Sequence, residues 1–212
     1  TTVGFVGSTG SGKTTIVDII LGLLQPNSGC VEVDNMLINS ENVRAWQKTI
    51  GYVPQQIYLS DDTIAANIAF GHDSNSIDYE AVESAAKIAN LHEFIIEKLP
   101  NGYHTKVGEQ GVRLSGGQRQ RIGIARALYY NPEVLIFDEA TSALDSVTER
   151  SVMEAVHRLG QKKTIIMIAH RLSTVRTCDC IYILEDGKIE DQGNFDELIE
   201  RNASFKSMSK GK

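Results

Sequence analysis

The sequence lacks any apolar run long enough to cross a membrane. Hydrophobic residues make up 42% of its 212 residues. None of the apolar segments approaches the roughly 18 consecutive residues that a membrane-spanning helix needs, and no signal-peptide pattern opens the chain. We therefore expect a polypeptide that does not cross a bilayer itself, and this expectation leaves room for a partner that does.

Cysteine is scarce, and an excess of positive charge is missing. The three cysteines, Cys30, Cys178 and Cys180, have neither the spacing of a disulfide framework nor that of a zinc site. Cys178 and Cys180 lie where a strand is expected to begin, so we interpret them as small buried thiols in a reducing cytosol. A net charge of −6 disfavours a nucleic-acid partner, because proteins that bind nucleic acid favour a basic face.

Short apolar runs alternate with helical patterns, which is typical of an α/β fold with a parallel sheet covered by helices. The expected parallel strands are Val3–Val6, Gly51–Val53, Val134–Phe137, Thr164–Ala169 and Ile181–Leu184. The segment Cys30–Asp34 alternates apolar and polar residues, which predicts a half-exposed antiparallel strand. A turn at Asp186–Gly187 predicts a late hairpin. We therefore expect a mainly parallel core with antiparallel edge strands.

Helices are expected between these strands. Lys13–Leu24 carries apolar residues on most faces, which predicts a buried helix. Asp78–Leu99 predicts one long helix, which lies far from any expected strand. We therefore assign residues 61–131 to a mainly helical subdomain, inserted between the two parts of a sheet-containing core at 1–60 and 132–212. Two pairs, Ser146 with Glu149 and Asn194 with Glu197, have the spacing of helix capping boxes.

The stretch GSTGSGKTT, Gly7–Thr15, follows the first expected strand and opens the first expected helix. It matches the phosphate-loop pattern G-x-x-x-x-G-K-[ST]. Glycines let backbone N–H groups converge on a phosphate, and the helix N-terminus adds partial positive charge. We expect Lys13 to reach the β- and γ-phosphates and the Thr14 hydroxyl to ligate Mg²⁺. The predicted nucleotide-binding residues are Gly7, Ser8, Thr9, Gly10, Ser11, Gly12, Lys13, Thr14 and Thr15.

The apolar run VLIFDE, Val134–Glu139, ends in two carboxylates. Ligands of open α/β sheets collect at the carboxyl ends of strands, and neighbouring side chains alternate across a strand, so the two acids receive different roles. Asp138 is predicted to hold Mg²⁺, directly or through water. Glu139 is predicted to polarise the attacking water, a form of general-base help worth about 10²–10⁴ in rate. A solvated acidic pair is the alternative interpretation.

Two further strand ends carry polar side chains. His170 follows TIIMIA and is assigned as a γ-phosphate contact that also steadies the attacking water. Gln55 follows another expected strand, and its carbonyl oxygen can serve Mg²⁺ or the water. The neighbouring Gln56 is a rival, because spacing alone does not separate the two glutamines.

The stretch LSGGQ, Leu114–Gln118, raises a second question. Ser115 and Gln118 fit the S-x-x-[EQ] capping box of an expected helix, so the motif can be read as a helix start alone. A cap does not need two glycines, however, and paired glycines let a ligand approach backbone N–H groups. Because this loop belongs to the helical subdomain and Lys13 to the core, we expect two copies, head to tail, to present the loop to each other's nucleotide.

The order of these motifs resembles that of ABC-type ATPases, whose signature LSGGQ matches in full, and the resemblance covers nearly the whole chain. It implies a P-loop ATP hydrolase that uses ATP and Mg²⁺ in a nucleotide-sandwich dimer. The residues implied to contact the partner's ATP are Leu114, Ser115, Gly116, Gly117 and Gln118. The loop implied to communicate across the dimer is SALD: Ser142, Ala143, Leu144 and Asp145.

Within that family the chain resembles exporters. VGEQGVRLSGGQ resembles the exporter pattern before the signature, which implies that Glu109 lies near loops of a transmembrane domain. Ile57–Gly71 resembles the segment that receives a coupling helix, and together with IGYVPQQ it resembles bacterial lipid-linked oligosaccharide flippases (PglK-like). The implied location is the cytoplasmic face of the inner (plasma) membrane.

The family also has an adenine-stacking aromatic residue well upstream of the phosphate loop, at a position that would precede Thr1. We therefore expect an excerpt that lacks the first antiparallel strands and binds ATP weakly by itself. Two other classes stay open. One is a soluble ABC-class mechanical ATPase acting on DNA or ribosomes, although no coiled-coil insertion or basic stretch is present. The other is a non-hydrolysing regulatory subunit, against which Glu139, His170 and Ser115 are intact.

Overall fold

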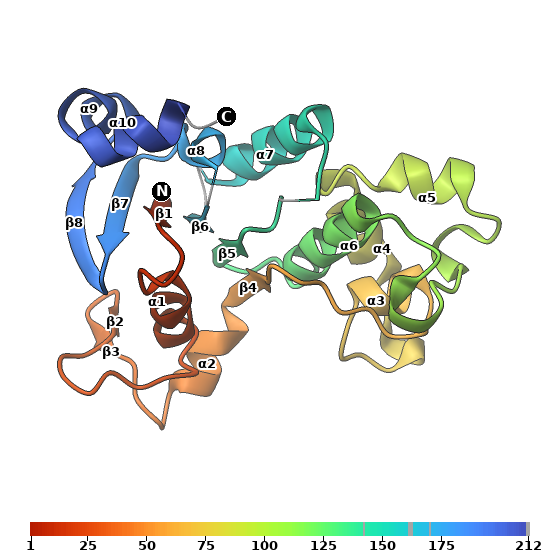
Figure 1. Ribbon diagram of the computed structural model, residues 1–212. Coiled ribbons are helices and arrows are strands. Elements are labelled where there is room, and N and C mark those ends of the chain that lie inside the picture. The colour runs from red at the N-terminus through yellow and green to blue at the C-terminus, as the bar shows by residue number, and fades with distance from the viewer. Residues whose placement is uncertain (142, 161–162, 170, 211–212) are drawn as a thin grey trace. The chain divides into compact units, whose positions relative to one another are not determined.

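The computed structural model describes residues 1–141, 143–160, 163–169 and 171–210 (Figure 1). The chain forms two compact units. The first unit consists of Thr1–Ile50 together with Thr164–Lys212, and the second unit of Gly51–Lys163. Among the described residues, no helix combines the length and the apolar character that crossing a membrane requires.

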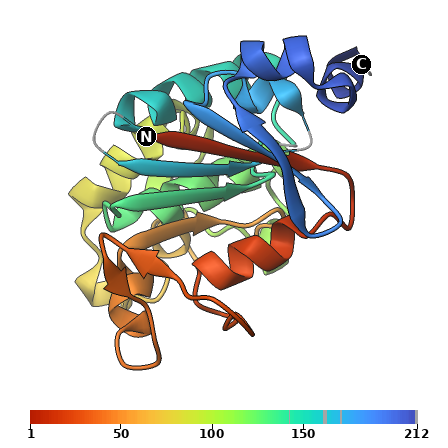
Figure 2. The same ribbon diagram turned by 90° about the vertical axis from the view of Figure 1, so that its left-hand side faces the viewer.

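Four described strands of the first unit lie side by side. Their order is β6 (Thr164–Ile168), β1 (Thr2–Gly7), β7 (Cys180–Glu185) and β8 (Lys188–Gly193). Figure 2 shows β1 between its two neighbours, and both pairings are parallel, with Val3 opposite Ile166 on one side and Cys180 on the other. β8 is antiparallel to β7, as the turn at Asp186–Gly187 predicts. Because β1 is flanked on both sides, its end at Gly7 is a fixed starting point for the loop that follows.

The remaining elements of the first unit are α1 (Lys13–Ile20), β2 (Glu32–Val33), β3 (Met36–Leu37), α2 (Val43–Lys48), α8 (Leu172–Val175), α9 (Phe195–Arg201) and α10 (Ala203–Lys210). The strand predicted at Cys30–Asp34 is present as β2, which is antiparallel to β3. The predicted cysteine burial holds for Cys178, where burial raises the pKa of the thiol to about 12. Cys180 is half-buried and Cys30 is exposed.

The prediction of a buried helix over Lys13–Leu24 is wrong in length and in burial. α1 ends at Ile20, and Leu23 and Leu24 are 64% and 47% exposed. Gly22 has a φ of 67°, the left-handed conformation that commonly ends helices. The indole N–H of Trp46 donates to the Ile20 carbonyl at 2.6 Å. A side chain from α2 therefore satisfies a carbonyl that a longer helix would have used.

β4 (Ile50–Val53), of which Gly51–Val53 belong to the second unit, lies beside β5 (Val134–Asp138). Gly51 makes this packing close. A Cβ atom added to Gly51 would lie 2.4 Å from the Ala127 carbonyl oxygen and 2.9 Å from Leu135 Cδ2, distances that side chains do not tolerate. The glycine therefore lets β4 approach its neighbours, and the chain leaves β4 towards Gln55.

The other elements of the second unit are α3 (Ile64–Ile68), α4 (Tyr79–Ile88), α5 (His92–Lys98), α6 (Gly116–Tyr129), α7 (Ser146–Gly160) and the short 3₁₀ turns η1 (Ser74–Ser76), η2 (Gly102–His104) and η3 (Glu109–Gly111). Within the described part of 61–131, the only strand-like feature is an isolated bridge between Thr63 and Lys106. The single helix predicted over Asp78–Leu99 is wrong, because the chain breaks between α4 and α5 at Asn90, whose φ is 52°.

The helix caps agree with the sequence at two of three places. The capping boxes of Ser115 with Gln118 and of Asn194 with Glu197 are both present. The box predicted for Ser146 with Glu149 is wrong, because Asp145 caps α7 instead. Asp145 Oδ1 accepts hydrogen bonds from Val147 N at 3.1 Å and Thr148 N at 3.0 Å. These bonds, led by the one from Thr148, lower the pKa of Asp145.

This cap predicts different stabilities for two neighbouring variants. Asp145→Ala removes the acceptor at the start of α7 and should lower the urea midpoint of unfolding, because the N-terminal N–H groups of the helix lose their cap. Ser146→Ala is the matched control and should leave the midpoint close to that of the parent. Urea denaturation followed by circular dichroism measures both. An equal loss in the two variants would contradict the assigned cap.

Candidate functional site

The loop Gly7–Thr15 leaves β1 at its carboxyl end and enters α1. Gly10 and Gly12 have φ values of 84° and 101°, in a region that residues with a Cβ rarely adopt. Gly12 occupies the N-cap position of α1, and no side chain caps this helix end. The backbone N–H groups of the first helical turn thus meet the loop without a side-chain acceptor, an arrangement that suits a phosphate.

Lys13 lies across this loop and is only 7% exposed. Its ammonium donates to the Gly7 and Ser8 carbonyl oxygens, each at 2.8 Å, and lies 3.5 Å from Ser11 Oγ. A buried ammonium needs such acceptors, because removing it from water is otherwise costly. The Nζ atom is therefore held by oxygen atoms of the predicted phosphate loop itself.

A second contact supports the loop from a segment that the sequence did not single out for this role. Gly187, in the turn between β7 and β8, donates its N–H to the Ser11 carbonyl at 3.1 Å. A Cβ atom on Gly12 would lie 3.4 Å from the Gly187 Cα. The hairpin turn was predicted, but its contact with the phosphate loop was not.

In the second unit, Asp138 and Glu139 follow β5, as predicted. The Tyr52 hydroxyl, on β4, donates to Asp138 Oδ2 at 3.2 Å and so orients the carboxylate. Sequence reasoning missed Tyr52, although its place three residues before Gln55 on the same strand end was a usable signal. Among the described residues, no group of three His, Cys, Asp or Glu could hold a metal ion by itself. Asp138 and Gln55 of this unit nevertheless carry carboxylate and amide oxygens, and Thr14 of the first unit carries a hydroxyl oxygen. All three are hard ligands of the kind that suit Mg²⁺.

Gln55 and Gln56 have different surroundings. The Gln55 amide nitrogen donates to Glu139 Oε2 at 2.7 Å, whereas Gln56 lines a pocket with Ile57 and Tyr58. Glu139 itself has a φ of 50°. A non-glycine residue in this left-handed region is uncommon and tends to occur at functional sites, where the surroundings hold it. The structure therefore joins the two catalytic candidates Gln55 and Glu139 by a hydrogen bond, while the metal role of Gln55 stays a prediction.

The LSGGQ loop begins α6 with a complete capping box. Ser115 N donates to Gln118 Oε1 at 2.7 Å, and Ser115 Oγ accepts from Gln118 N at 3.2 Å. Arg119 Nη1 donates to the Leu114 carbonyl at 2.7 Å. Ser115 is exposed, so the same hydroxyl that caps the helix also faces solvent. The helix-start reading of the motif is thus correct, and it leaves the loop accessible.

Ala143, in the described part of the predicted loop Ser142–Asp145, lies against the start of α6. Ala143 N donates to Oε1 of Gln120 at 2.9 Å, and Leu144 is buried. Sequence reasoning missed Gln120. Two of the predicted residues, Ser142 and the catalytic candidate His170, lie outside the described residues, so their roles stay predictions.

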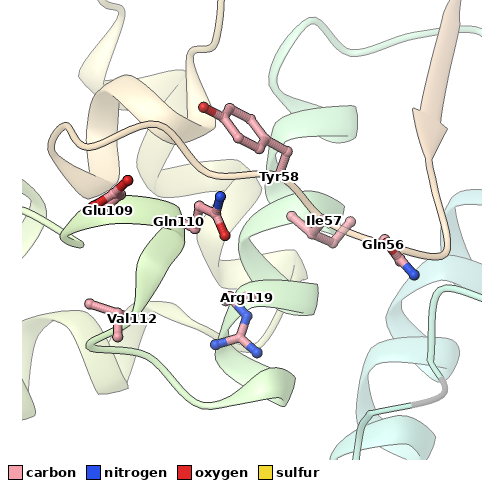
Figure 3. Close-up of a pocket in the computed structure, with 7 residues that line it drawn as sticks. All are labelled: Gln56, Ile57, Tyr58, Glu109, Gln110, Val112 and Arg119. Atoms are coloured by element: carbon pink, nitrogen blue, oxygen red, sulfur yellow. The ribbon is translucent and has the colours of Figure 1, made fainter.

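A pocket of about 740 Å³ lies in the second unit. Figure 3 shows the segment Gln56–Tyr58 facing the segment Glu109–Val112, with Arg119 projecting from α6 beside them. Tyr58 is 64% exposed and Val112 75% exposed. Glu109, predicted to lie near a partner's loops, is thus part of an open hollow that also displays apolar surface.

Comparison with known proteins places these motifs in a family. The ABC transporter family model matches residues 1–142. An ATP-dependent lipid A-core flippase of Saccharophagus degradans is 47% identical over 98% of this chain and 35% of its own length. ABC transporter B family member 17 of Arabidopsis thaliana is 48% identical over 92% of this chain and 16% of its own length.

A solved structure agrees in fold. The structure of a bacterial Atm1-family ABC exporter with ATP bound superimposes with a TM-score of 0.91 at 40% identity, covering 98% of this chain and 36% of that chain. The chain therefore spans about a third of the length of the flippase and of this exporter.

Proposed function

Because the chain belongs to the ABC transporter family, as an ATP-binding domain, we propose that it binds and hydrolyses ATP with Mg²⁺ to power an exporter or flippase. The observation that carries this proposal is the Gln55–Glu139 hydrogen bond of 2.7 Å, which brings together two polar residues that lie 84 positions apart. Such a pair serves the activation of water. The soluble alternative gains no support, since the matching family and the relatives described above are transporters.

The phosphate-binding role falls to the first unit. Lys13 exchanges its contacts with the Gly7 and Ser8 carbonyls for contacts with the β- and γ-phosphates, and the uncapped N–H groups of α1 bind the same oxygens. Thr14, Gln55 and Asp138 would hold Mg²⁺, which when bound neutralises charge on the phosphates. Tyr52 keeps the Asp138 carboxylate in one orientation.

The hydrolytic role falls to Glu139, which polarises the attacking water. Gln55 fixes the Glu139 carboxylate from the side, through its amide nitrogen. His170 contacts the γ-phosphate and steadies the water, an assignment that rests on its position directly after the strand TIIMIA. General-base catalysis of this kind is worth about 10²–10⁴ in rate.

The nucleotide site is completed by a second copy of the chain, arranged head to tail. Ser115 and Gly117 of one copy contact the ATP held by Lys13 of the other, and Ser142–Asp145 communicate between the two. This proposal is supported by the exposure of Ser115 and by the two glycines that follow it. Closure of the dimer around ATP would then drive the attached transmembrane domains, because ATP binds the closed state better than the open one.

A transmembrane domain, in the same or another chain, docks on the second unit at the cytoplasmic face of the membrane. The pocket lined by Tyr58, Glu109 and Val112 offers apolar surface beside a carboxylate, which suits the end of a short amphipathic helix. The transported molecule is proposed to be a glycan-bearing lipid, such as a lipid-linked oligosaccharide. The resemblance of Ile57–Gly71 to flippase sequences supports this substrate class.

Removing the carboxylate of Glu139 should separate binding from hydrolysis. Glu139→Gln in the full-length transporter should keep ATP affinity within about twofold and lower kcat by about 10²-fold or more, because the general base is lost. The variant should also accumulate as an ATP-bound dimer in size-exclusion chromatography. Glu200→Gln, an exposed carboxylate on α9, is the control and should hydrolyse ATP like the parent. Equal turnover in Glu139→Gln and the parent would remove Glu139 from its role.

Mixed dimers test whether each site draws on two chains. One chain carries Lys13→Ala and the other Ser115→Arg. In a head-to-tail dimer, one site then holds both defects and the other holds none, so the purified mixed dimer should bind one ATP tightly. Equilibrium dialysis with labelled ATP measures this number, and each homodimer should bind none tightly. A mixed dimer without any tight site would mean that each site is built within one chain.

The docking pocket predicts uncoupling without unfolding. Val112→Arg places a long cation at a 75% exposed position, so the melting temperature and ATP affinity should not change. Transport in vesicles should fall about tenfold, the loss expected for one interface anchor. Ile96→Arg, at a 55% exposed position on α5 outside the pocket, is the matched control. Equal transport by the two variants would place the membrane domain elsewhere.

A further inference from the structure

Gln120 is a polar residue in a place where polar residues are rare. It lies on α6, two residues beyond the LSGGQ stretch, and is only 4% exposed. Buried polar side chains are nearly always hydrogen-bonded, and Gln120 Oε1 accepts the N–H of Ala143 at 2.9 Å. Residue 143 belongs to the segment that follows the catalytic candidate Glu139. The contact therefore joins α6 to the segment that follows Glu139, within the second unit.

The glycines of the signature make this contact close. A Cβ atom on Gly116 would lie 3.4 Å from Ala143 Cβ, and one on Gly117 would lie 3.2 Å from the Ala143 carbonyl oxygen. The second distance is tighter than ordinary side-chain contact, so any larger residue would push Ala143 away. The paired glycines thus allow Ala143 to pack closely against the start of α6. They also leave the backbone of the LSGGQ loop open to a ligand.

The segment between Glu139 and Ala143 is also held at its other end. Ala140 and Thr141 are buried, and Thr141 Oγ1 donates to Glu149 Oε1 on α7 at 2.8 Å. Leu144 N donates to the Thr141 carbonyl at 3.0 Å. Thr141 and Ala143 are thus each held by a helix side chain, Glu149 on α7 and Gln120 on α6, and both holds act on the chain that follows Glu139.

We propose that Gln120 is a positioning residue that fixes the Glu139 carboxylate by holding Ala143. The inference rests on the proposed function and deepens it. In a head-to-tail dimer, Ser115 serves the partner's ATP while Glu139 serves the chain's own ATP. Gln120 is then the link within one chain between the loop that senses the partner's nucleotide and the base that acts on its own.

The backbone conformation of Glu139 explains why contacts from other residues are needed to keep it in place. Its φ of 50° is a conformation that a glutamate does not favour by itself. Without the acceptor on Gln120, the Ala143 N–H loses its partner and the segment relaxes towards other conformations. The carboxylate then moves relative to the attacking water, whereas the phosphate contacts of Lys13 belong to the other unit and stay as they are. The expected effect is on kcat and not on KM.

The test is Gln120→Met in the full-length transporter, since methionine keeps the length of the side chain but accepts hydrogen bonds poorly. The ATPase kcat should fall about tenfold or more, because small misplacements of a catalytic group are costly, and the KM for ATP should stay within about twofold. Gln120→Glu keeps an oxygen acceptor at the same reach and should retain most of the parent's kcat. Gln192→Met, an exposed glutamine on β8, is the matched control.

A double variant separates positioning from general damage to the fold. If Gln120 acts through Glu139, then adding Gln120→Met to Glu139→Gln should slow hydrolysis no further, because the two losses share one cause. A further tenfold loss in the double variant would overturn the inference. Rates are expressed per tightly bound ATP, so that unfolded protein does not count as lost catalysis. If Gln120→Met cannot be recovered folded, Gln120→Asn, which withdraws the amide by one methylene, replaces it.

The outcomes distinguish this inference from the proposed function. A parent transporter that hydrolyses no ATP would refute the proposed function. A parent that hydrolyses ATP, with Gln120→Met at the parent's kcat or with the loss confined to KM, would refute the role of Gln120 alone. Loss of kcat in both Gln120→Met and Gln120→Glu would show that the accepted hydrogen bond is not what matters.

Discussion

The close packing of two glycines at the start of α6 against Ala143 is the constraint on which the second unit depends. A side chain at Gly117 would meet the Ala143 carbonyl at 3.2 Å, and the Gln120–Ala143 hydrogen bond of 2.9 Å needs the same close approach. Through this contact the start of α6, which carries the LSGGQ loop, also holds the chain segment that follows Glu139. The glycines of a signature sequence therefore have a packing role that is separate from ligand binding.

Three of the polar groups assigned to phosphate or water chemistry already have a protein partner. Lys13 donates to backbone carbonyls, Gln55 donates to Glu139, and Ser115 caps its own helix. A hydrogen bond exchanged for another contributes little net free energy, whereas a lost one is costly. When a nucleotide binds to such a site, hydrogen bonds within the protein are replaced by hydrogen bonds to the nucleotide. The selectivity for the nucleotide then depends on which protein groups lose their original partners.

The sequence predicted the strands well, because β1, β4, β5, β6 and β7 are apolar runs that periodicity alone identifies. It failed where the chain turns through left-handed residues, at Gly22 and Asn90, and where a distant side chain decides a helix end, as Trp46 does. Tyr52 and Gln120 were missed because their partners lie 86 and 23 residues away. Residue spacing identifies a motif, but the contacts that position it are set by packing.

The central claim is that one ATP is held by two chains, and cross-linking tests it most directly. The native Cys30, Cys178 and Cys180 are replaced, one full-length chain receives Thr9→Cys, and a distinguishable second chain receives Ser115→Cys, both with Glu139→Gln. A short bifunctional thiol reagent should then join the two chains when ATP and Mg²⁺ are added, and hardly at all without them. No cross-link between the two chains with ATP and Mg²⁺, together with an internal cross-link in a control chain that carries both Thr9→Cys and Ser115→Cys, would contradict the account.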